Sequence, residues 1–157
     1  MAASRDSAQD RAAQNRAAQD RAALQGLLAA ENVAVYGYGL AGAQLSGSLL
    51  TSAQQDWNLH RAARATVSAM ITRLGGTPAP AAAAYRPPFA VTSAATARSL
   101  AALLEDGLVQ AYLGLVALDD QELRAFGAGE MQAAAIRAAY WRGGTTAFPG
   151  LPSSALK

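Results

Sequence analysis

Two stretches of the sequence place residues at alternating intervals of four and three, and this spacing constrains the fold more than any other feature. The stretches run through Leu24, Leu28, Glu31, Val35, Tyr38, Gly42 and Leu45, and through Ala53, Trp57, His60, Arg64, Val67, Ile71 and Leu74. Residues with this spacing share one face of an α-helix. We therefore expect two amphipathic helices that bury this face against neighbours, with a turn at 46–52 between them.

The composition favours an all-α chain. Among 157 residues there are 41 alanines and 19 leucines, but only eight valines and isoleucines together. Alanine and leucine favour helices, whereas strands are rich in β-branched and aromatic residues. The net charge is only +2, and the basic residues are not clustered, so we expect no nucleic-acid partner. The absence of cysteine excludes disulfides and thiol-based sites.

A long linker separates two pairs of helices. Gly75 and Gly76 end the second helix, and residues 76–92, which contain four prolines, are expected to be extended. At about 3.1 Å per residue, this segment reaches roughly 50 Å, the length of a helical bundle. A third helix is expected from Thr92 or Ser93 to about Leu118, and a fourth from Asp119-Asp120 to about Trp141. Two helical hairpins with a long crossover between helices two and three predict a ferritin-like four-helix bundle.

The chain divides into three regions around this bundle, which covers residues 24–142. Residues 1–23 contain three copies of a five-residue repeat, at 8–22, whose period favours no single face of a helix. We expect an exposed helical extension that continues into the first helix. Residues 143–157 are expected to form an extended tail packed on the bundle.

Neither a signal peptide nor a membrane-spanning segment is expected, which predicts a cytoplasmic protein without a membrane partner. The outer faces of the predicted helices are rich in alanine and poor in charge. Because apolar surfaces of this kind usually mark contacts, we expect a homodimer.

The two predicted hairpins repeat each other. The first and third helices share the order Glu-x-x-x-Val-x-x-Tyr, and the second and fourth each carry an arginine seven residues after the motif begins. The paired residues are Glu31, Val35 and Tyr38 with Glu105, Val109 and Tyr112, and Trp57, His60 and Arg64 with Glu130, Ala133 and Arg137. This internal repeat predicts a pseudo-two-fold relation between the hairpins.

Four ionisable residues stand in apolar helical stretches, one on each predicted helix: Glu31, His60, Glu105 and Glu130. Burying a charge is costly unless it is paired or bound to a metal. Di-iron bundles place one Glu on each of two helices and Glu-x-x-His on each of the others. The four residues match four of these six positions, while Trp57 stands in place of one Glu and Ala133 in place of one His. They are therefore the candidate metal ligands.

The sequence Tyr-Gly-Tyr-Gly at 36–39 and the sequence Thr-Ala-Phe-Pro-Gly-Leu-Pro at 146–152 resemble an uncharacterised bacterial ferritin-like family. The resemblance covers about residues 24–152. It implies the ferritin-like fold and no established activity. In that family a His often follows the first Glu, whereas this chain has Asn32.

Three interpretations of the polar residues follow. The first is a non-catalytic bundle with a degenerate di-iron centre and no cofactor, in which the carboxylates pair with His60, Arg64 and Arg137 and with the tyrosines Tyr38 and Tyr112. The alternative is a metal-binding protein or oxidase that uses a single iron or another divalent metal. The third is a small ligand in the bundle core, and whether the chain is an enzyme stays open.

Gly37, Gly39 and Gly42 form a Gly-x-Gly-x-x-Gly sequence that resembles a dinucleotide-binding turn. This motif offers a competing hypothesis to the helical bundle. Asp56 stands near the place of a ribose-binding acid. The fingerprint also needs a second strand near Asp56, and the sequence there does not favour one. We therefore expect these glycines to lie inside a helix, where small residues allow close packing.

Overall fold

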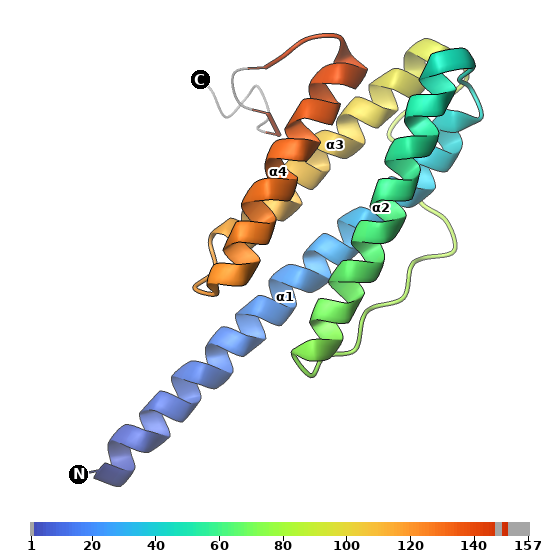
Figure 1. Ribbon diagram of the computed structural model, residues 1–157. Helices are drawn as coiled ribbons and strands as arrows, with labels where there is room; N and C mark the ends of the chain where they lie inside the picture. Colours follow the sequence, from blue (N-terminus) through green and yellow to red (C-terminus); the bar gives the residue numbers. More distant parts are fainter. Residues whose placement is uncertain (1, 147–148, 151–157) are drawn as a thin grey trace.

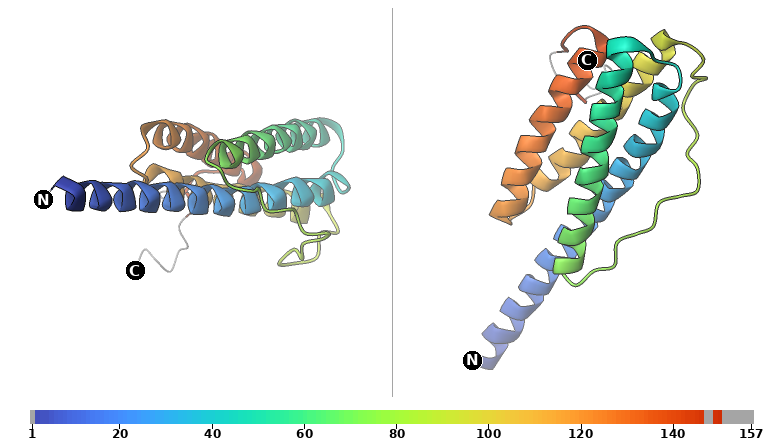
Figure 2. Two further views of the ribbon diagram at one scale, coloured as in Figure 1. Left: turned by 90° about the horizontal axis from the view of Figure 1, so that it is seen from below. Right: turned by 45° about the vertical axis from the view of Figure 1, so that its right-hand side comes forward.

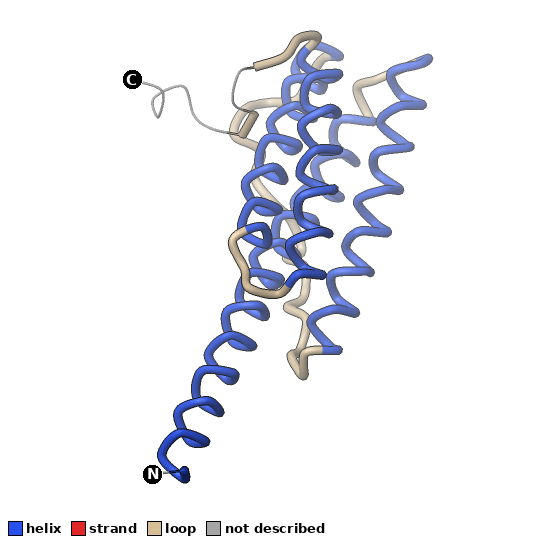
Figure 3. Tube along the Cα trace, turned by 60° about the vertical axis from the view of Figure 1, so that its left-hand side comes forward, coloured by secondary structure: helices blue, strands red, loops and turns tan. Residues whose placement is uncertain are grey.

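The computed structural model describes residues 2–146 and 149–150, and these residues contain helices and loops but no strand (Figures 1 and 3). The predicted all-α class and the four helices are confirmed. The helices are α1 (Ala2–Gly42), α2 (Gly47–Arg73), α3 (Ala94–Val116) and α4 (Gln121–Arg142).

The helices form two layers, α1 beside α3 and α2 beside α4 (Figure 2). Helix α1 packs against α2 and α3, and α3 packs against α4. Within the described residues, no Cα atom of α2 lies within 8 Å of a Cα atom of α4. The side of the bundle between α2 and α4 is therefore more open than the others.

Capping residues define three of the helix ends. Ser93 and Thr96 form a capping box at the start of α3, and the Asp120 side chain accepts a hydrogen bond from the Leu123 amide at the start of α4. Gly143 adopts a left-handed conformation, with φ 78°, and ends α4.

The turn before α2 is shorter than expected. The prediction of a turn over 46–52 is wrong, because α2 already begins at Gly47 after the N-cap Ser46. Small polar residues suggested a turn there, but Leu49 and Leu50 pack against the apolar core and draw these residues into the helix.

Residues 74–93 connect α2 to α3 without a helix or strand and run along the length of the bundle (Figures 1 and 2). As a result, α2 and α3 point in the same direction. The Gln25 side chain holds the segment to α1, since it donates to the Thr77 carbonyl at 2.7 Å and accepts from the Ala79 amide at 3.0 Å.

Helix α1 extends well beyond the bundle at its N-terminal end, where it carries the five-residue repeats (Figure 1). Residues 9–16 of this extension are exposed. Helix α3 is long and apolar enough to cross a membrane by length and composition alone. Half of that stretch is buried within the protein, and a core helix of a bundle passes the same test.

The core consists of two apolar clusters. One is rich in leucine and includes Leu24, Leu28, Ile71, Leu108 and Leu115. The other contains mainly alanines around two aromatic residues, Tyr38 and Trp141. Charged and polar side chains are also buried in the bundle, among them Glu31, His60 and Glu105, and they form the candidate site.

Candidate functional site

Three of the predicted residues meet in the centre of the bundle. His60 of α2 lies between Glu31 of α1 and Glu105 of α3, and all three side chains are buried. Its Nδ1 atom lies 3.0 Å from Glu31 Oε2, and its Nε2 atom lies 2.9 Å from Glu105 Oε1. A single imidazole thus bridges both carboxylates.

Two tyrosines complete this centre in a pseudo-symmetric way. Tyr112 of α3 donates its hydroxyl hydrogen to Glu31 Oε1 of α1 at 2.6 Å. Tyr38 of α1 donates in the same way to Glu105 Oε1 of α3, also at 2.6 Å. Each hairpin therefore supplies the phenol that binds the carboxylate of the other, an exchange that agrees with the internal repeat. The Tyr38 ring also stacks on the His60 ring, with centroids 5.1 Å apart.

Arg137 of α4 supplies the last donor of this centre. Its Nε atom donates to Glu105 Oε2 at 3.0 Å, and its side chain is only 17% exposed. With this bond, all four carboxylate oxygens of Glu31 and Glu105 accept a hydrogen bond from a protein donor. Buried polar groups are costly unless they are satisfied, and these two are fully satisfied.

The centre favours a protonated histidine. Burial lowers the pKa of His60, but the hydrogen bonds to Glu105 and Glu31 and the charges of these two groups outweigh burial and raise it to about 9. Burial also raises the pKa values of Tyr38 and Tyr112, and the neighbouring carboxylates raise them further, so both phenols keep the hydrogen that they donate. An imidazolium and a guanidinium thus oppose two carboxylates.

Glu130 and Arg64 lie outside this hydrogen-bonded set. Glu130 is half-buried and lines a cavity of about 200 Å³ between α2 and α4, together with His60 and Arg137. Arg64 is also half-buried. Within the part of the chain that the structure describes, neither side chain makes a hydrogen bond or an ion pair. The structure therefore brings Arg137 to the centre, but not its counterpart Arg64.

Trp57 does not fill the space at the centre. Its Nε1 atom donates to the Val35 carbonyl of α1 at 3.1 Å, and the guanidinium of Arg61 lies 4.5 Å from the centre of its ring. Trp57 thus packs in the contact between α1 and α2.

Asp56 joins the centre, although the sequence suggested it only as a ribose-binding acid. Its Oδ2 atom accepts a hydrogen bond from Trp141 Nε1 at 2.8 Å and lies 3.3 Å from the Tyr38 hydroxyl, whose single hydrogen is donated to Glu105. Burial is the main cause that raises the pKa of Asp56, while the hydrogen bond from Trp141 lowers it. Asp56 lies four residues before His60 on α2, and this helical spacing is the signal that places both side chains on one face.

Gly37 and Gly39 of the competing motif lie inside α1, and Gly42 is its last residue, so the motif does not form a phosphate-binding turn between a strand and a helix. At Gly37, a Cβ atom would lie 2.5 Å from the Leu104 side chain of α3, so this glycine allows close packing as expected. At Gly39, a Cβ atom would meet nothing within 4 Å, and packing does not explain this second glycine.

The donor set does not fit a metal ion in this arrangement. A metal needs a lone pair from imidazole and free carboxylate oxygens. Here both ring nitrogens of His60 contact carboxylates, and every oxygen of Glu31 and Glu105 already accepts a hydrogen bond. A metal would have to displace the imidazolium proton and break these contacts.

Comparison with known proteins places the chain among proteins without an assigned function. A crystal structure of a conserved hypothetical protein from Mycobacterium tuberculosis is similar to it, with a TM-score of 0.77 and 31% sequence identity. The match covers 80% of this chain and 96% of that protein.

No curated protein matches the chain. The DUF4439 family, described as a domain of unknown function, matches residues 23–153, which include all of α2, α3 and α4. This range is most of the sequence, so the chain belongs to the DUF4439 family.

Proposed function

We propose that the chain is a non-catalytic helical bundle whose buried Glu/His/Arg network is a degenerate di-iron centre that now holds the helices together. The complete satisfaction of Glu31 and Glu105 by protein donors carries this proposal. A redox or hydrolytic centre keeps an open position for its substrate, whereas every oxygen of these two carboxylates is engaged.

A distant ferritin-like relationship supports the same proposal. The candidate ligands come one from each helix, α2 and α3 run in the same direction, and a long segment connects them. The hairpins also exchange their tyrosine–glutamate hydrogen bonds symmetrically. His60 and Arg137 break this symmetry, because their counterparts in the repeat do not take part in the network. In this proposal, their positive charges replace the charge of a metal.

The network has a mechanical role in this proposal. His60 links α2 to both α1 and α3, and Arg137 links α4 to α3. Helix α2 packs on α1 and helix α4 packs on α3, and these bonds add links through the centre of the bundle, including the link from α2 to α3, two helices that have no close backbone contact in the described part of the chain. Fully satisfied buried networks can specify one arrangement of a core.

The alternative is a single divalent metal ion held by Glu31, His60, Glu105 and Glu130. One observation favours it: Glu31, His60 and Glu130 line the same cavity between α2 and α4. A metal there requires a neutral His60 and a rearranged hydrogen-bond set. The alternative therefore predicts that adding metal changes the protonation of His60 and the hydrogen bonds around it.

Metal analysis and iron oxidation separate these proposals. Protein purified without a histidine tag is analysed for bound metals, and its melting temperature is measured with and without chelator. Ferrous iron is then added in air, and ferric species are followed by absorbance. We expect substoichiometric metal, no effect of the chelator and oxidation at the protein-free rate. Faster oxidation that Glu130→Ala abolishes would instead establish the metal-binding alternative.

A further inference from the structure

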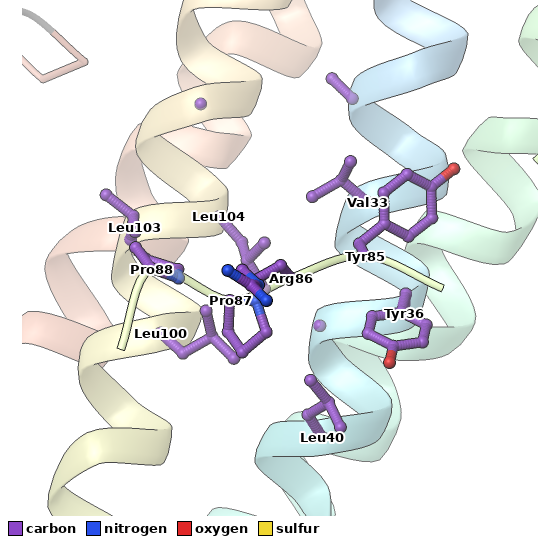
Figure 4. A pocket seen from close by; sticks show the side chains of 13 residues that line it. Val33, Tyr36, Leu40, Tyr85, Arg86, Pro87, Pro88, Leu100, Leu103 and Leu104 are labelled. Atoms are coloured by element: carbon purple, nitrogen blue, oxygen red, sulfur yellow. The ribbon is translucent and has the colours of Figure 1, made fainter. Parts of the chain in front are cut away.

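A second cavity lies on the side of α1 and α3 that faces away from α2 and α4, beneath the segment that connects α2 to α3. Residues 85–88 cross from α1 to α3 and cover a groove of about 260 Å³ (Figure 4). Tyr85 packs edge-on against Tyr36 of α1, with ring centroids 5.5 Å apart. Pro87 and Pro88 lie on the α3 side of the groove. The covering segment is therefore held at both ends while the space beneath it stays open.

The walls of this groove are almost entirely apolar. Val33 and Leu40 line it from α1, and Leu100, Leu103 and Leu104 line it from α3. Leu103 remains 46% exposed, so part of its apolar surface is free to contact a ligand. Gly107 forms part of the wall, and a Cβ atom there would meet nothing within 4 Å. The volume lies just below the roughly 300–1,000 Å³ that is usual for small-molecule sites.

One charged side chain stands at this groove. Arg86 lies in the covering segment between Tyr85 and Pro87, and it is exposed (Figure 4). No acidic residue lines the groove, and Arg86 forms no ion pair within the described residues. A guanidinium binds a carboxylate through two parallel hydrogen bonds.

We propose that this groove binds a free aliphatic carboxylate, with its hydrocarbon chain between α1 and α3 and its carboxylate on Arg86. A single cation beside apolar walls matches a ligand with one anionic group and an otherwise apolar body. A nucleotide or a sugar would need several further polar partners, which these walls do not provide. The site is independent of the polar centre, because Val33, Tyr36 and Leu40 occupy a different face of α1 from Glu31 and Tyr38.

Titration calorimetry with straight-chain carboxylates below their micelle concentrations tests the apolar part. We expect the Kd to fall by about two- to fourfold for each added methylene from hexanoate to decanoate, because each methylene leaves water. A longer chain, such as hexadecanoate, should gain little, because the groove is then full. Absence of saturable decanoate binding would overturn the proposal.

Filling the groove tests where the chain binds. Gly107→Leu places a side chain in the open space and should weaken decanoate binding at least tenfold. Gly129→Leu is the matched control, since Gly129 is a helical glycine of α4 that also has open space around its Cβ position and does not line the groove. Equal losses in both variants would overturn the assignment of the site.

Removing the charge tests the head group without disturbing a helix. Arg86→Gln should weaken decanoate binding about tenfold and leave decanol binding unchanged, because only the acid uses the guanidinium. Arg16→Gln, an exposed arginine on the N-terminal extension, is the control and should change neither ligand. If decanoate and decanol bind the wild type equally well, Arg86 does not receive a carboxylate and the proposal is wrong.

Discussion

His60 is the residue on which the charge balance of the bundle core depends. It is the only histidine in the sequence, and its ring lies between two fully buried carboxylates on different helices. Neutral imidazole could donate only one hydrogen, so one of the two contacts would lose its hydrogen bond. The imidazolium form satisfies both, and this preference makes the stability of the fold depend on pH.

We predict that the protein loses stability as the pH rises from about 6.5 to about 9. The pKa of His60 is about 9 in the folded protein and near its usual 6.5 in the unfolded chain, so folding favours the protonated form. The resulting stabilisation, roughly 3 kcal/mol, is complete below pH 6.5 and disappears as the pH passes 9.

Urea unfolding at several pH values, with His60→Gln as the comparison, measures this effect. The difference between the two proteins should shrink between about pH 6.5 and 9, while both keep any pH dependence that other groups cause. Because there is one histidine, its imidazole proton NMR signals can also be followed without assignment. A titration midpoint near 6.5 would contradict the proposed charge state.

Arg137 and Arg64 give a second prediction at the residue scale. The internal repeat makes them equivalent, but Arg137 donates to buried Glu105 and Arg64 makes no ion pair within the described residues. Arg137→Met should therefore destabilise the protein by about 3 kcal/mol, because a buried carboxylate loses its cation. Arg64→Met should cost less than about 0.5 kcal/mol. Equal losses in denaturant unfolding would show that Arg64 also serves the centre.

This difference marks the limit of what the sequence predicts about the site. Helical spacing places Glu31, His60 and Glu105 on facing sides of their helices, and that is sufficient to predict their meeting. The spacing of residues on a helix predicts which way a side chain points, but not how deeply it is buried. Because α2 and α4 are not in close contact, Glu130 lies beside a cavity. The role of Asp56 depends on Trp141, a contact between residues 85 positions apart that no local pattern contains.

Glycines determine how closely the helices approach. Gly127 of α4 lies against α3, and a Cβ atom there would come within 2.7 Å of Leu115 Cβ and 3.0 Å of the Tyr112 carbonyl oxygen. Neither atom can move without shifting the α3 backbone. Gly129, two residues later, has open space around its Cβ position.

We predict opposite effects for alanine at these two positions. Gly127→Ala should destabilise the protein by about 1–3 kcal/mol, because it forces α3 and α4 apart. Gly129→Ala should stabilise it by about 0.5–1 kcal/mol, because alanine is the better helix former. Thermal and urea unfolding measure both. A stabilising Gly127→Ala would mean that the α3–α4 contact is looser than described.

At the element scale, the sequence predicts helices better than their boundaries. The helix starts at Ser93 and Asp120 can be predicted from the sequence, because the side chains of these capping residues accept hydrogen bonds from amides of the first helical turn. The sequence places the start of α2 too late, because the small polar residues around it resemble a turn, whereas Leu49 and Leu50 favour a helix and pack against the core. The predicted tail over 143–157 lies largely outside the described residues.

At the scale of the whole molecule, the open side between α2 and α4 also exposes large apolar residues. Leu59 of α2 is 54% exposed, and Ile136 and Tyr140 of α4 are 65% and 50% exposed. The Tyr140 hydroxyl lies 2.9 Å from the Ser52 hydroxyl of α2, so this tyrosine spans the gap between the two helices. Ile136 is one helical turn before Tyr140 on the same face. An exposed apolar surface of this kind commonly marks a contact.

We propose that two copies associate through this α2–α4 face as a homodimer, because a two-fold arrangement buries the same apolar surface on both subunits. Light scattering at micromolar concentration should give the mass of a dimer.

Ile136→Glu places two charges in the interface and should produce monomers without unfolding the bundle, since Ile136 is mostly exposed in the single chain. Leu113→Glu is the matched control: Leu113 lies on α3, is 43% exposed and should leave the dimer intact. A monomeric wild type would refute dimerisation, and dissociation by Leu113→Glu alone would move the interface to the face of α3.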